Sequence, residues 1–84
     1  MHFVSQETDP LWVQKTLEGD PQAFGELVQQ YERDVFNLAY RMLNERGEAE
    51  DAAQEAFLRA YANLDRYDQS RSFKTWLLSI TSNH

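Results

Sequence analysis

Two carboxylates, Asp51 and Glu55, lie four residues apart in a stretch of helical pattern, a spacing that places both on one helix face. With the adjacent Glu50, such a pair can hold a divalent cation, as in a carboxylate metal hydrolase. No histidine lies within reach, because His2 and His84 stand at opposite ends of the chain. There is also no cysteine, no nucleophile beside a base and no glycine-rich phosphate loop. We therefore expect no enzyme, no metal site and no cofactor.

The charged side chains are distributed unevenly along the 84 residues, whose net charge is −6. Residues 1–58 carry four basic and twelve acidic side chains, whereas residues 59–84 carry four basic and two acidic ones. No acid follows Asp68. An acid-free, mildly basic end leaves room for a nucleic-acid surface, although chance alone produces such an asymmetry equally well.

Side chains suited to unpaired bases gather in this basic end. Aromatic rings and arginine stack on bases, and an amide can read a base edge. The candidates for contact are Arg66, Tyr67, Arg71, Lys74 and Asn83. Phe73 and Trp76 are expected to lie mainly in the core, and a purely solvated Ser/Thr face remains the alternative interpretation.

Leu58 is the one large apolar residue in the polar half of a predicted helix, among Asp51, Gln54 and Glu55. An apolar anchor surrounded by polar groups is typical of a partner-binding helix. Single exposed leucines are nevertheless common and need no cause. The helical wheel leaves both interpretations open.

Periodicity and capping signals predict an all-α, compact bundle of about four helices. Asp9-Pro10 and Asp20-Pro21 each resemble an N-cap followed by proline at the first helical position, and Ser72 is a further candidate cap. The first helix is expected to end at Gly19 and the second near Asn44. The third is expected over residues 48–64, before a polar loop over residues 65–71.

The same patterns predict which faces are buried. The core stripe expected for the second helix is Phe24, Val28, Tyr31, Val35, Leu38 and Met42. The core face expected for the third is Ala49, Ala52, Ala53, Ala56, Phe57, Ala60, Tyr61 and Leu64. The stripe expected for the fourth is Phe73, Trp76, Leu77 and Ile80.

No apolar run is long enough to span a membrane, and no secretory signal is recognisable at the N-terminus. We therefore expect a cytoplasmic protein. Residues 1–9 are expected to form an N-terminal arm and residues 10–84 one domain. The fourth helix runs to the C-terminus without a stop signal, which indicates a piece of a longer protein.

Four stretches together resemble a known family. They are Gly19-Asp20-Pro21-Gln22-Ala23-Phe24, Tyr31-Glu32-Arg33-Asp34-Val35, the run from Ala49 to Tyr61, and Ser72-Phe73-Lys74-Thr75-Trp76-Leu77. In order and spacing they closely resemble region 2 of bacterial sigma factors of the extracytoplasmic-function (ECF) type. The resemblance extends from about Pro10 to His84 and implies a helical bundle for transcription initiation.

The resemblance implies that the third helix binds core RNA polymerase, on the clamp helices of its largest subunit. By position, the residues of that contact are Asp51, Gln54, Glu55, Leu58 and Tyr61. This is the polar helix face on which Leu58 is the one large apolar residue. An anti-sigma partner is also implied.

The resemblance further implies that the loop from Tyr67 to Ser72, with the helix after it, captures the non-template strand of the promoter minus-ten element. Such proteins hold a flipped base in a pocket beside this loop. The implied DNA-binding residues are Arg66, Tyr67, Asp68, Gln69, Ser70, Arg71, Ser72, Lys74, Ser79 and Asn83. Because the domain is small and acidic, we expect weak, salt-sensitive DNA binding by the isolated chain.

Two departures from the family pattern favour a second interpretation. Asp68-Gln69-Ser70 stand where the family loop often has a glycine, and Ser79 stands where a basic residue is common. The second, helix-turn-helix domain of the family is absent from this sequence. A protein-interaction module that binds polymerase or an anti-sigma factor without touching DNA therefore remains the alternative.

Overall fold

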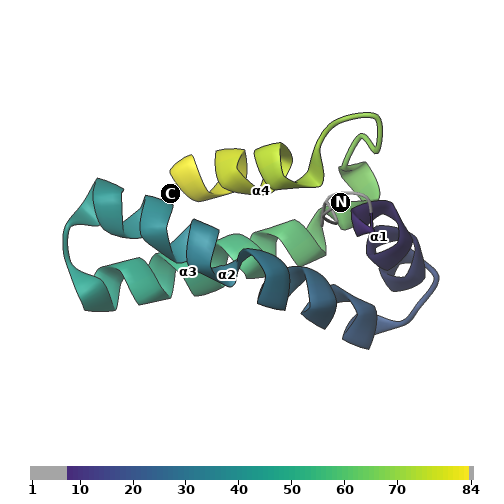
Figure 1. Ribbon diagram of the computed structural model, residues 1–84, viewed down its shortest axis with the longest axis horizontal. Coiled ribbons are helices and arrows are strands. Elements are labelled where there is room, and N and C mark those ends of the chain that lie inside the picture. Colours follow the sequence, from purple (N-terminus) through teal and green to yellow (C-terminus); the bar gives the residue numbers. More distant parts are fainter. Residues whose placement is uncertain (1–7, 84) are drawn as a thin grey trace, which may run out of the picture.

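The computed structural model describes residues 8–83, which form four α-helices and one short 3-10 turn (Figure 1). The elements are α1 (Asp9–Leu17), α2 (Pro21–Leu43), α3 (Arg46–Ala62), η2 (Leu64–Arg66) and α4 (Phe73–Ser82). The expected all-α bundle of about four helices is confirmed. His2, His84 and most of the expected arm lie outside the described residues. Among residues 8–83, no helix is sufficiently long and apolar to cross a membrane.

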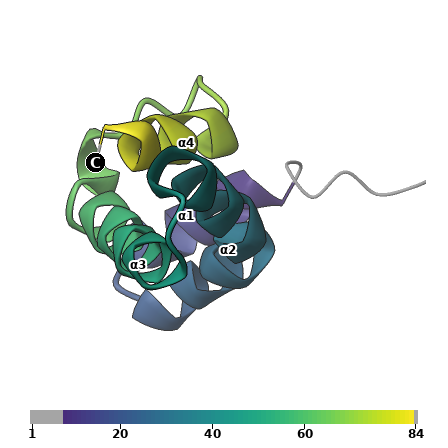
Figure 2. The ribbon, with the colours of Figure 1, turned by 90° about the vertical axis from the view of Figure 1, so that its left-hand side faces the viewer.

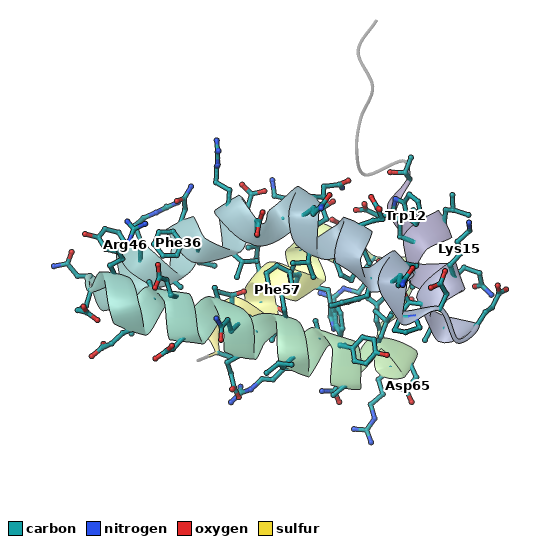
Figure 3. All side chains as sticks on the ribbon, turned by 90° about the horizontal axis from the view of Figure 1, so that it is seen from below. Trp12, Lys15, Phe36, Arg46, Phe57 and Asp65 are labelled. Carbon is teal, nitrogen blue, oxygen red and sulfur yellow. The ribbon has the colours of Figure 1, made fainter. Side chains whose placement is uncertain are left out.

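The long helices α2 and α3 run antiparallel side by side, and α4 packs on one side of this pair (Figures 1 and 2). α1 lies across one end, next to η2 and the loop that leads into α4. This arrangement leaves the opposite side of the α2–α3 pair without a covering helix in this part of the chain (Figure 3).

Side-chain caps fix most of the helix starts. Asp20 accepts a hydrogen bond from the Gln22 amide (3.1 Å), and Ser72 accepts one from the Thr75 amide (3.2 Å), so both predicted caps are confirmed. α3 begins at Arg46, two residues before the predicted start, because Glu45 rather than Glu48 supplies the capping carboxylate.

The prediction that Asp9 caps α1 is wrong. Thr8 occupies the N-cap position, and Asp9 is the first residue inside the helix rather than part of an arm. Its side chain turns inward and is only 3% exposed. The reason is a tertiary contact, since Tyr31 and Gln30 of α2 both donate hydrogen bonds to the Asp9 carboxylate.

The core joins all four helices. Its buried members are Val13, Phe24, Leu27, Tyr31, Val35, Ala56, Ala60, Leu64, Phe73 and Leu77. α3 contributes mainly alanines, which allow close approach of α2. Two details of the predicted faces are wrong, because Met42 (43% exposed) and Tyr61 (48% exposed) lie at the surface. Leu64 is buried as predicted, but it belongs to η2, since α3 ends at Ala62. Because α4 covers only one side of the pair, helix periodicity overestimates burial on the other side.

Candidate functional site

A long groove runs between α2 and α3 on the side away from α4 (Figure 3). One part has a volume of about 440 Å³ and is lined by Phe24, Val28, Gln54, Phe57, Leu58 and Tyr61. A second part, of about 670 Å³, is lined by Val28, Glu32, Arg33, Phe36, Asn37, Glu50, Ala53, Gln54 and Phe57. Val28, Gln54 and Phe57 belong to both parts, so we treat them as one feature, the α2–α3 groove. Figure 3 shows Phe57 between the two helices.

The structure brings together three of the five predicted polymerase contacts. Gln54, Leu58 and Tyr61 line the apolar part of the groove, and Leu58 is 67% exposed. Asp51 and Glu55 are exposed on α3 but do not line the groove. An exposed leucine beside an apolar groove differs from an isolated surface leucine, because a partner can desolvate both at once. Burying such a side chain contributes about 1.5–3 kcal/mol.

The α2 half of this groove was missed by the sequence analysis. Phe24 and Val28 were assigned to the core, although they also form one wall of the groove. Phe36 and Arg46 lie at its far end, where the guanidinium sits 5.6 Å from the ring centroid (Figure 3). The sequence carried no clear signal for this wall, because the α2 apolar stripe also packs against α1, α3 and α4.

A smaller pocket of about 260 Å³ lies at the loop between η2 and α4, at the end where α1 crosses. Its lining residues are Asp9, Pro10, Tyr67, Gln69, Ser70, Arg71, Ser72 and Phe73. We call this the loop pocket. Five of the predicted DNA-binding residues line it, all from the loop. Asp9 and Pro10, which come from α1, were not predicted.

Asp68 folds the loop in the absence of a glycine. Its carboxylate accepts hydrogen bonds from the amide (3.0 Å) and the hydroxyl (2.7 Å) of Ser70, and its carbonyl accepts one from the Arg71 amide (2.9 Å). These bonds, with the nearby Arg71 charge, hold the pKa of Asp68 below its ordinary value of 3.8. The departure from the family glycine is thus compensated by an Asx turn.

Tyr67 closes the other side of the loop. Its hydroxyl donates to the Arg71 carbonyl, and its ring packs on Phe73 and Trp76 at centroid distances of 5.6 and 4.8 Å. Burial, with the nearby Asp9 and Asp68 carboxylates, raises the pKa of the Tyr67 phenol. The phenol therefore remains a neutral donor, and the loop is preformed rather than open.

Because the Asp68 pKa is lowered on folding, its contribution to the loop is complete above the ordinary value of 3.8 and is lost as the pH falls through the lower folded value. We expect the protection of the Ser70 amide against hydrogen exchange, relative to the intrinsic rate at each pH, to fall over that acidic interval, as NMR hydrogen exchange would detect. In an Asp68→Asn variant, whose amide oxygen accepts the same bonds, this pH dependence should vanish. An equal acid response in both forms would contradict the assignment.

The other predicted DNA-binding residues lie outside the loop pocket. Lys74 reaches Asp34 of α2 at 3.6 Å, and the Ser79 hydroxyl donates to the Trp76 carbonyl at 2.6 Å. Asn83 is exposed at the C-terminal end of α4, while the loop precedes its first residue. The helix separates them by about 15 Å at 1.5 Å per residue. Asn83 and the loop therefore cannot contact the same base.

Comparison with known proteins resolves the family. The model of sigma-70 region 2 matches residues 27–84, more than half of the chain. The chain belongs to the sigma-70 region 2 family. This is a domain of a transcription initiation factor rather than of an enzyme. Within residues 8–83, no three His, Cys, Asp or Glu side chains gather where they could hold a metal ion.

The relatives of this region 2 domain are ECF sigma factors. The chain is 46% identical over 71 residues to the ECF RNA polymerase sigma factor SigW of Bacillus subtilis, covering 84% of this chain and 38% of that protein. It is 38% identical over 78 residues to the ECF RNA polymerase sigma-E factor of Escherichia coli K12, covering 93% and 40%. The chain thus spans about two fifths of the length of these relatives.

A solved structure has the same fold. It is the NMR structure of an engineered region 2 of sigmaE in complex with GTAAAA, with a TM-score of 0.85 and 40% sequence identity. The alignment covers 96% of this chain and 84% of that one. The four-helix bundle of this region 2 domain is therefore that of a domain solved with DNA bound.

Proposed function

We propose that this region 2 domain binds core RNA polymerase through the α2–α3 groove and captures unstacked non-template bases of the promoter minus-ten element with the loop pocket and α4. Its place of action is the bacterial cytoplasm. The polymerase contact is assigned to Gln54, Leu58 and Tyr61, with Asp51 and Glu55 beside them. The clamp helices of the largest subunit are the proposed partner.

The observation that carries the DNA half of the proposal is the loop pocket, in a fold whose sigmaE relative was solved with GTAAAA. α4 is about 15 Å long, and a strand extends at least ~3.4 Å per nucleotide, so no more than about five nucleotides are needed to reach from the loop pocket to Asn83. A strand anchored in the loop pocket can therefore follow α4 as far as Asn83. In this geometry, the loop and Asn83 contact different nucleotides of one strand.

The charge distribution is consistent with a domain that captures bases while the polymerase binds most of the phosphates. Unstacking a base costs a few kcal/mol. A small acidic domain with few free cations cannot provide the binding free energy for this and also bind the phosphates of the duplex. Arg66 and Arg71 are exposed near the loop, whereas Lys74 is paired with Asp34. We infer that the polymerase supplies most phosphate contacts and this domain supplies base capture.

An anti-sigma factor is the third proposed partner. An inhibitor that fills the α2–α3 groove would block the proposed polymerase contact directly, and part of this groove is lined mainly by apolar side chains. This proposal names the surface and does not assign individual contacts.

The DNA half is tested with a fluorescently labelled GTAAAA oligonucleotide and an Asn83→Ala variant at one fixed, low salt concentration. We expect the variant to bind at least about 5-fold more weakly, because a base-edge contact contributes about 1–3 kcal/mol. Fluorescence anisotropy gives the two dissociation constants.

The matched control is Ser82→Ala, which removes the neighbouring exposed hydroxyl that donates to the Ser79 carbonyl. It should bind as the unmodified chain does. If all three forms bind GTAAAA equally well, Asn83 is not part of the DNA interface. Absence of GTAAAA binding by the folded, unmodified chain would favour the alternative, a protein-interaction module.

A further inference from the structure

We propose that the first turn of α1 forms a fixed wall of the loop pocket, and that Asp9 is the positioning residue that holds this wall in place for one unstacked nucleobase. The inference rests on the proposed DNA function and extends it to a helix outside the loop–α4 interface. The observation behind it is that Asp9 and Pro10 line the same pocket as five residues of the loop.

Asp9 ties α1 to α2 at the bottom of this wall. The Gln30 amide donates to one carboxylate oxygen at 2.7 Å, and the Tyr31 hydroxyl donates to the other. The residue is 3% exposed, and every buried side-chain polar atom in the described residues has a hydrogen-bond partner. Burial, together with the hydrogen bond to Asp9, raises the pKa of the Tyr31 phenol, which therefore stays a neutral donor.

The same contact continues through aromatic rings to the opposite wall. Tyr31 packs on Phe73 with ring centroids 5.9 Å apart, and Phe73 packs on Tyr67 at 5.6 Å. Tyr67 then donates to the Arg71 carbonyl and closes the loop. Asp9 thus holds the α1 wall of the pocket directly. Through Tyr31 it also borders the rings of Phe73 and Tyr67, which support the loop wall.

The pocket suits a base better than a phosphate. At about 260 Å³ it lies below the ~300–1,000 Å³ typical of sites for larger ligands. Its lining combines the rings of Tyr67 and Phe73 with hydroxyl and amide groups of Gln69 and the loop serines. The lining carries one acid, Asp9, and one base, Arg71, so the pocket has little net charge to attract a phosphate. A neutral planar base meets aromatic surface and hydrogen-bonding edges there.

The substitution Asp9→Asn weakens this anchor with almost no change in volume. An asparagine side chain is neutral, so the two charge-assisted hydrogen bonds from Gln30 and Tyr31 are replaced by weaker neutral ones. The first turn of α1 is then tied less firmly to α2. We expect the pocket wall to loosen and the helices to remain folded.

The experiment measures base capture rather than overall affinity. Each nucleotide of GTAAAA is replaced in turn by an abasic one, and dissociation constants are measured for the unmodified chain, Asp9→Asn and Glu18→Gln. Glu18, at the other end of α1, is exposed, and its carboxylate accepts a hydrogen bond from the Gln14 side chain. Its substitution removes the same negative charge, which controls for the general strengthening of DNA binding.

We expect the unmodified chain and Glu18→Gln to lose about tenfold in affinity when the captured base is removed, as base stacking of 1–3 kcal/mol implies. In Asp9→Asn, this loss should fall to less than about threefold, with unchanged helicity by circular dichroism. A merely structural role would weaken all oligonucleotides equally and leave the tenfold ratio intact.

Other results separate this inference from the function on which it rests. If Asp9→Asn keeps the full loss at the same nucleotide, the positioning role is overturned and base capture stands. If no abasic position matters even to the unmodified chain, base capture itself is overturned. If Asp9→Asn does not fold, the Pro10→Ala variant is measured instead, because it shortens the exposed residue of the α1 wall. A tenfold loss on base removal that is retained in Pro10→Ala overturns the role of the α1 wall. A smaller loss supports it.

Discussion

A Leu58→Glu variant is expected to bind bacterial core RNA polymerase at least 30-fold more weakly than the unmodified chain. The side chain is 67% exposed and lines the apolar part of the α2–α3 groove, so the fold gains little from it and a partner can gain much. A glutamate there would place a charge in a desolvated contact, and truncation of a central anchor already costs about 2 kcal/mol or more. Labelled chain titrated with core polymerase gives the affinity.

The control for this prediction is Leu11→Glu. Leu11 is also an exposed leucine (50%) on a helix, but it lies on α1 and does not line the groove. It should retain the affinity of the unmodified chain, and all three forms should have the same helicity. A similar loss in both variants would point to a general charge effect. No loss in either would place the polymerase contact elsewhere.

Replacing Leu77 by alanine is expected to lower the free energy of unfolding by about 2–5 kcal/mol. Leu77 is fully buried where α4 meets the core, so the substitution leaves a cavity as well as losing transfer free energy. Domains of this size have total stabilities of about 5–15 kcal/mol, so the loss is a large fraction. Urea denaturation followed by circular dichroism measures it.

Leu17→Ala is the matched comparison, because Leu17 is 40% exposed at the end of α1. Its cost should remain below about 1 kcal/mol. Comparable losses at both positions would mean that α4 is not packed as described. That result would also remove the rigid support of the loop pocket, since Phe73 at the start of α4 lines it.

Two identical dipeptides show what the sequence can and cannot predict. Asp20-Pro21 and Asp9-Pro10 both carry the local signature of a capped helix start. Asp20 caps α2 as predicted, because nothing distant competes for its carboxylate. Asp9 instead bonds Tyr31, 22 residues away in sequence, and only the packing of α1 on α2 reveals that partner.

The candidate site shows the same division between local and tertiary information. A helical wheel identifies Leu58 as unexpected on a polar face, because that judgement needs only the spacing within α3. It cannot show that Phe24 and Val28 of α2 lie beside it in one groove, since this depends on the antiparallel pairing. Likewise, the DNA-binding prediction names Asn83 together with the loop residues, but only the structure shows that α4 lies between them.

The central proposal is that polymerase and DNA bind to separate faces of one bundle, with α4 and the α2–α3 groove on opposite sides (Figures 2 and 3). Its most direct test is the affinity of the Leu58→Glu variant for GTAAAA. With both measurements made at about 0.15 M salt, where the Debye length is ~8 Å, we expect this affinity to lie within about twofold of that of the unmodified chain while polymerase binding is lost, because charges on opposite faces are then largely screened. A loss of GTAAAA binding in step with polymerase binding, with the fold intact, would contradict the assignment of two faces.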